Sequence, residues 1–174
     1  MISSVGVGAT SAGGTGTLYI DKTDDNYGIG EGLTFHADAE DNIAIGENAL
    51  NSTAGAALAN IGIGTSALTA VTSGEKNIAI GYQALLVEAA GDFSTAVGYQ
   101  ALKAQTGIDG AVGNTAIGYQ AGLSLIGGLE NTILGRSAMN SSTDADKCVV
   151  IGSTACQSNM TAAADGTIAI LALI

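Results

Sequence analysis

A five-residue motif recurs along most of this chain and constrains its fold more than any other feature. The copy at residues 77–81 reads Asn-Ile-Ala-Ile-Gly. The glycines that close seven such copies lie 17 to 20 residues apart: Gly46, Gly64, Gly81, Gly98, Gly118, Gly135 and Gly152. Self-similarity at a short, nearly fixed period is typical of proteins that stack one structural unit on the next.

Each unit predicts two short strands joined by a corner. The motif alternates with a period of two, as strands do, and its glycine would weaken a helix by about 1 kcal/mol. A segment of the form x-x-Ala-Leu follows the glycine, as at Ala84-Leu85, and turn residues close the unit. We therefore predict an all-β chain, a parallel β-roll or β-solenoid of two-strand coils of about 17 residues, stacked about 4.8 Å apart over residues 42–171.

Side-chain size alternates within the motif as well. The residue before the glycine is large and aliphatic in all seven copies: Ile45, Ile63, Ile80, Val97, Ile117, Leu134 and Ile151. The central residue is small in most copies: Ala44, Gly62, Ala79, Ala96 and Ala116. We interpret these as opposite faces of one strand, with the small residues on the face that a neighbouring subunit approaches closely.

Composition narrows the classes of function. Sixteen acidic and five basic residues give a net charge of −11, which argues against binding to nucleic acid or to anionic membranes. Charged residues are 12% of the chain, against about 25% in ordinary soluble domains, and mean hydropathy is +0.36. We infer that much of the surface is buried between subunits. The longest apolar run, 168–174, is far shorter than the roughly 20 residues of a membrane span, so we expect no membrane insertion.

The repeats resemble those of a known family. The stretch Asn-Thr-Ala-Ile-Gly-Tyr-Gln-Ala at 114–121, with near copies at 77–85 and 94–102, resembles the repeats of bacteriophage tail-fibre proteins. It is also similar to the head β-roll of YadA-type trimeric autotransporter adhesins. The resemblance implies an intertwined homotrimer that contributes to attachment at a host surface, in the virion or, alternatively, on a bacterial cell. Because the N-terminus lacks the pattern of a secretory signal, we expect assembly in a cytoplasm, unless a signal was removed, and favour the virion.

This interpretation divides the chain into three parts. Residues 1–41 are expected to be a β-rich segment that caps the roll or docks it to other virion proteins, residues 42–171 the roll, and 172–174 a tail. We expect a non-enzymatic part of a trimeric tail fibre or spike. The alternatives are a capsid decoration or head-fibre protein, an adhesin head that binds host glycan or matrix, and a glycan-cleaving tailspike.

Candidate sites are few. Tyr82, Tyr99 and Tyr119 occupy equivalent positions on successive units and form either a strip that stacks on glycan or a self-stacking ladder. Eight acidic residues between Asp21 and Glu47 match no calcium-binding loop, so no metal site is expected. His36 is the sole histidine, which argues against a catalytic base, and no cofactor is expected. Cys148 and Cys156 are either two buried thiols or a disulfide.

Overall fold

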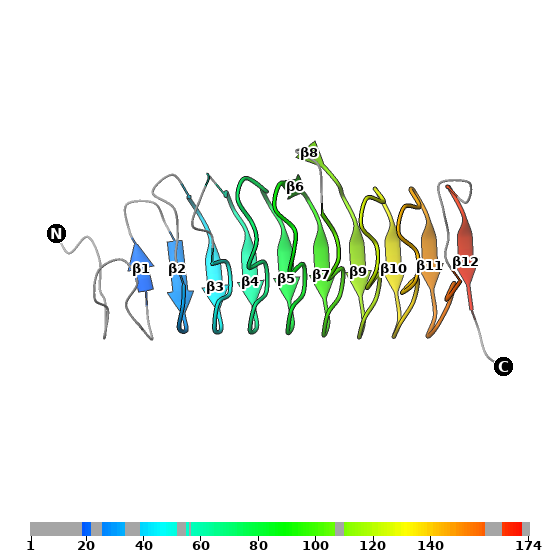
Figure 1. Ribbon diagram of the computed structural model, residues 1–174, viewed down its shortest axis with the longest axis horizontal. Helices are drawn as coiled ribbons and strands as arrows, with labels where there is room; N and C mark the ends of the chain where they lie inside the picture. Colours follow the sequence, from blue (N-terminus) through cyan, green and yellow to red (C-terminus); the bar gives the residue numbers. More distant parts are fainter. Residues whose placement is uncertain are drawn as a thin grey trace.

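The chain forms one long, all-β solenoid, seen from the side in Figure 1. The computed structural model describes residues 19–21, 26–33, 39–51, 55, 57–106, 110–158 and 165–171. Its strands are β1 (Tyr19–Asp21), β2 (Asn26–Ile29), β3 (Ile43–Ile45), β4 (Ile61–Ile63), β5 (Ile78–Ile80), β6 (Gly91–Asp92), β7 (Thr95–Val97), β8 (Gly110–Ala111), β9 (Thr115–Ile117), β10 (Thr132–Leu134), β11 (Val149–Ile151) and β12 (Ile168–Ile170). The predicted all-β parallel solenoid is confirmed over these residues.

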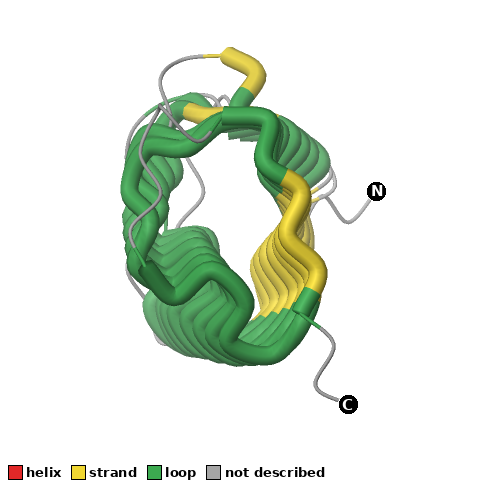
Figure 2. The backbone as a smooth tube through the Cα atoms, turned by 90° about the vertical axis from the view of Figure 1, so that its right-hand side faces the viewer, coloured by secondary structure: helices red, strands yellow, loops and turns green. Residues whose placement is uncertain are grey.

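One sheet of ten strands forms a wall of the solenoid. Its order is β1-β2-β3-β4-β5-β7-β9-β10-β11-β12; every pair is parallel except β1 with β2. Equivalent motif positions lie opposite one another, so that Ala79 pairs with Ala96 and Ile80 with Val97. A second, two-stranded parallel sheet joins β6 to β8. Viewed end-on in Figure 2, the strand wall faces a wall of loops and turns across a narrow interior.

The second segment of each unit is built from turns rather than from a regular strand. Gln83 and Leu85 both have positive φ, at 54° and 49°, and Gln100 and Leu102 repeat the pattern at 55° and 49°. Residues of a regular strand do not adopt this left-handed conformation. The segments still stack through backbone hydrogen bonds, such as that from Leu85 N to the Ala101 carbonyl at 3.1 Å. We call this side of the molecule the turn wall.

The small central residues of the strands point inward, so the prediction that a neighbouring subunit approaches them is wrong. Ala44, Ala79, Ala96 and Ala116 are fully buried inside their own chain. They pack in one core with the leucines of the turn wall. The interior is thin, and a strand residue as small as Ala leaves room there for a leucine from the opposite side.

Residue size in the two walls is complementary. A Cβ added to Gly62 would lie 3.1 Å from Cγ of Leu50, so the leucine fills the space that glycine leaves. The relation reverses later in the chain, where a Cβ added to Gly122 would lie 3.0 Å from Cδ1 of the buried Ile133. A large residue in one wall is therefore matched by a small one in the other.

The sheet extends upstream of the predicted boundary at residue 42. β2 carries a degenerate copy of the motif and pairs in parallel with β3, with Gly28 opposite Ala44. β1 then runs antiparallel to β2 and interrupts the parallel order. Residues 1–18, 22–25 and 34–38, which include His36, and the predicted tail at 172–174 lie outside the described residues.

Candidate functional site

The outer face of the strand wall is an exposed aliphatic surface. Because strand side chains alternate between faces, burying the central residue turns its two neighbours outward. Ile43, Ile80 and Ile117 are each about two-fifths exposed, and Ile168 and Ile170 at the last strand are about 70% exposed. Among the nine parallel strands of the ten-stranded sheet, none of the outward positions holds a charged residue. We call this surface the strand face; at about 4.8 Å per strand it is roughly 38 Å long.

The predicted corner glycines lie directly after the strands, where the chain leaves the strand wall. Gly46, Gly64, Gly81, Gly98, Gly118, Gly135 and Gly152 have φ between 124° and 140°. A Cβ on Gly81 would overlap the backbone carbonyl of Gly98 in the next unit. Both the conformation and the close approach of backbones therefore require glycine at this corner.

The three predicted tyrosines form a stacked ladder immediately after these corners. Ring centroids of Tyr82 and Tyr99 are 5.1 Å apart with planes inclined by 17°, and those of Tyr99 and Tyr119 are 5.2 Å apart at 9°. The adjacent amides form a second ladder, in which Gln100 donates to Gln83 and Gln120 donates to Gln100, both at 2.9 Å. Tyr99 therefore has a tyrosine ring on each face, and each of the three tyrosines remains 42–48% exposed.

A buried column of asparagines was not anticipated from the sequence. Asn77 donates from Nδ2 to the Gly91 carbonyl at 2.7 Å, and its Oδ1 accepts the backbone N–H of Ser94 at 2.8 Å. The same arrangement repeats at Asn42, Asn60 and Asn131, all of which are buried. The sequence feature that could have revealed the column is the asparagine that recurs at the first motif position. A buried amide there can bond backbone groups of two successive units at once.

The column is interrupted at Ser94, where a different buried network takes over. Gln105 donates from Nε2 to Oγ of Ser94 at 2.9 Å and to Oε2 of Glu88 at 2.6 Å. Its Oε1 accepts from Nδ2 of Asn114 at 3.0 Å. Glu88 also accepts the backbone N–H of Gly91 at 2.8 Å. The long Gln105 side chain thus supplies the amide oxygen that serine lacks.

The remaining candidates are the acidic residues near the N-terminus and the two cysteines. The His, Cys, Asp and Glu residues that the structure describes form no group of three or more that could hold a metal ion. Glu31, Glu40, Asp41 and Glu47 are all exposed, whereas Asp24, Asp25 and Asp38 lie outside the described residues. Cys148 and Cys156 are free thiols, and burial raises the pKa of Cys156, with a further contribution from Cys148. No helix long and apolar enough to span a membrane occurs within the described ranges.

Comparisons with protein-family models, with curated proteins and with solved structures find no match to this chain.

Proposed function

We propose that this protein is a structural, non-enzymatic rod segment of a homotrimeric virion fibre or spike that contributes to host attachment. The observation that carries the proposal is the strand face, an uncharged aliphatic surface that runs along the whole parallel sheet. An exposed apolar patch of this extent is unusual on a monomer and marks an interaction surface. The resemblance of the repeats to phage tail-fibre repeats supports the same assignment.

The occupant that best fits the strand face is another copy of the same chain. The face offers only aliphatic side chains, threonines and one tyrosine, Tyr27, so it provides no charged group to select a different partner. The sixteen acidic residues lie elsewhere in the sequence and disfavour association through other surfaces. Three copies with their strand faces turned to a common axis would bury all three faces together and leave three turn walls outside.

The test is the mass of the purified protein in solution. Light scattering is expected to give three times the 17.0 kDa chain, about 51 kDa. A lysine on the strand face, Ile80→Lys, is expected to produce monomers, because it would place three like charges at the apolar axis. Val87→Lys is the matched control, since Val87 is as exposed as Ile80, 38% against 37%, but lies on the turn wall. A monomeric native chain, or equal effects of the two variants, would contradict the proposal.

A further inference from the structure

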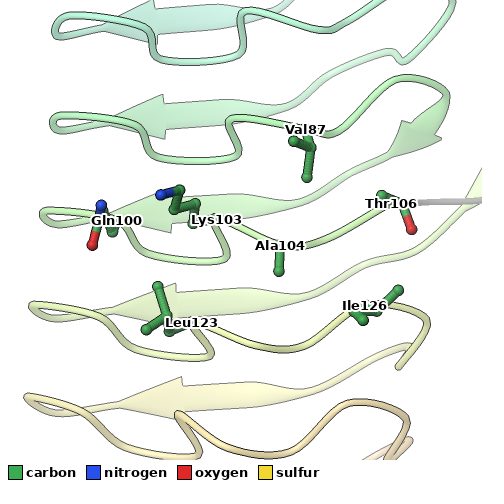
Figure 3. A pocket seen from close by; sticks show the side chains of 7 residues that line it. All are labelled: Val87, Gln100, Lys103, Ala104, Thr106, Leu123 and Ile126. Atoms are coloured by element: carbon green, nitrogen blue, oxygen red, sulfur yellow. The ribbon is translucent and has the colours of Figure 1, made fainter.

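The turn wall carries an open pocket of about 500 Å³. Its lining comes from three successive units, as Figure 3 shows. Val87 belongs to the first, Lys103, Ala104 and Thr106 belong to the second, and Leu123 and Ile126 belong to the third. This volume is within the range of sites for small organic ligands.

The repeat provides an internal reference for the pocket. Counted from the first motif residue, the lining side chains occupy the ninth, tenth and twelfth positions that follow. In the unit before the pocket these positions hold Thr69, Ala70 and Thr72, and in the unit after it they hold Asn140, Ser141 and Thr143. The aliphatic lining is therefore confined to these three turns. Stacking of the solenoid does not require it, because the neighbouring units stack without it.

The floor of the pocket is Ala104, with bulkier residues on both sides. Val87 holds the equivalent position in the preceding unit and is 38% exposed. In the following unit the equivalent residue is Ser124, and Ile126, two residues further on, is 49% exposed. Gln100 closes one side; its amide is held on both sides by Gln83 and Gln120. The small alanine between larger side chains creates the hollow, and its exposed aliphatic groups favour a hydrocarbon ligand.

Lys103 gives the pocket its one cation. Two of the protein's other lysines are paired, Lys76 with Glu75 at 2.7 Å and Lys147 with Glu130 at 4.0 Å. Among the residues that the structure describes, no carboxylate lies within ion-pair distance of Lys103. On a chain of net charge −11, an ammonium with no carboxylate partner among the described residues, beside an aliphatic hollow, is complementary to a ligand that is apolar at one end and anionic at the other.

We propose that this pocket binds a small amphiphilic carboxylate, such as a medium-chain fatty acid. The hydrocarbon chain lies over Ala104 between Val87 and the Leu123–Ile126 side. The carboxylate is held at Nζ of Lys103, on the Gln100 side of the pocket (Figure 3). The turn wall lies across the interior from the strand wall (Figure 2). The pocket, whose lining belongs to the turn wall, therefore stays open in a trimer assembled through the strand face, and its occupancy does not depend on the oligomeric state.

Octanoate is the probe, titrated into the full chain with ¹³C-labelled methyl groups. Saturable shifts are expected at the methyl signals of Val87, Leu123 and Ile126, with unchanged signals from Ile80 and Ile117 on the strand face. Octan-1-ol, which lacks the charge, is expected to bind the native chain roughly tenfold more weakly than octanoate does. Octanoate is expected to bind the Lys103→Gln variant roughly tenfold more weakly than it binds the native chain. Lys147→Gln is the control for loss of a positive charge elsewhere and should bind octanoate normally.

A second variant tests the hollow itself. Ala104→Leu fills the floor at a half-buried surface position and is expected to abolish the saturable shifts. Four results would overturn the proposal: no saturation by about 10 mM octanoate, equal affinity for octanoate and octan-1-ol, undiminished binding by Ala104→Leu, or shifts spread over both walls. The last result would show that octanoate merely adsorbs to any exposed aliphatic surface.

Discussion

The two walls of the solenoid differ in how strictly each unit repeats the previous one. The strand wall places a small or aliphatic residue inward, uncharged residues outward and a glycine at the exit in unit after unit. The turn wall keeps its buried alanine in every unit, but the leucine after it gives way to Gly122, Met139 and Cys156 in the later units. Its outward positions change from Thr69 to Leu86, Lys103, Leu123 and Asn140. Stacking constrains both interiors, whereas only the strand wall is also uniform on its outside.

This difference separates two kinds of role. A uniform exterior suits contact with identical neighbours, because every unit presents the same surface to the next chain. A variable exterior suits recognition of something that is not a repeat, at particular places along the rod. The following experiments test whether the regular features hold the fold, and whether the irregular ones can change without affecting it.

The largest effect is expected at a strand-wall corner, in Gly81→Ala. The new Cβ would overlap the Gly98 carbonyl, and φ is 135°, so strain and overpacking together should lower the free energy of unfolding by about 3–5 kcal/mol. Denaturant midpoints at unchanged slope measure the loss.

Gly110→Ala is the matched control for that corner. Gly110 also has a positive φ, 112°, but apart from its chain neighbours no described residue lies within 4 Å of where its Cβ would be. Only the conformational strain remains, and a loss of about 1 kcal/mol is expected. Equal losses at Gly81 and Gly110 would show that close approach of the backbones is not what requires glycine at the corner.

The next largest effect is expected in the buried asparagine column. Asn77→Ala removes the partners of the Gly91 carbonyl and the Ser94 N–H, and leaving two buried groups unpaired should cost about 2–4 kcal/mol. Thr72→Ala on the turn wall also removes one hydrogen bond, from Thr72 Oγ1 to the Ala89 carbonyl at 3.0 Å, but at a partly exposed site. Its expected loss is below about 1 kcal/mol, and comparable losses in the two variants would argue against the column as a main support of the fold.

The strands and their stacking were predictable because a period of two and a recurring glycine are local signals. Which face of the strand is buried was not predictable, because it depends on the residues of the opposite wall. Ala79 points inward because leucines of the turn wall fill the space beyond it. The turn conformation of the second segment was missed because leucine at positive φ, as in Leu85, contradicts its usual preference. The pocket depends on residues brought together from three units and has no motif of its own.

The interruption at Ser94 provides a coupled test of the column. Ser94→Asn alone should be destabilising, because Gln105 already occupies the place of the amide. Adding Gln105→Leu copies the unit that begins at Asn114, where Leu125 holds the equivalent position, and should recover about 1–2 kcal/mol of the loss. A double-mutant cycle measured by chemical unfolding gives the coupling. Additive losses would show that serine and glutamine do not act as substitutes for the asparagine.

The smallest effect is expected at the tyrosine ladder, which lies at the corner between the two walls. Tyr99→Ser removes the ring between Tyr82 and Tyr119 and should cost about 1 kcal/mol, because both stacked contacts are exposed on one side. Retention on immobilised host polysaccharide is then measured for the native chain and the variant. If the rings contribute only to stability, by stacking on one another, the native chain and the variant are retained equally. A native chain that is retained and a Tyr99→Ser variant that is not would instead assign the ladder to recognition, and the uniform part of the rod would then include a binding surface.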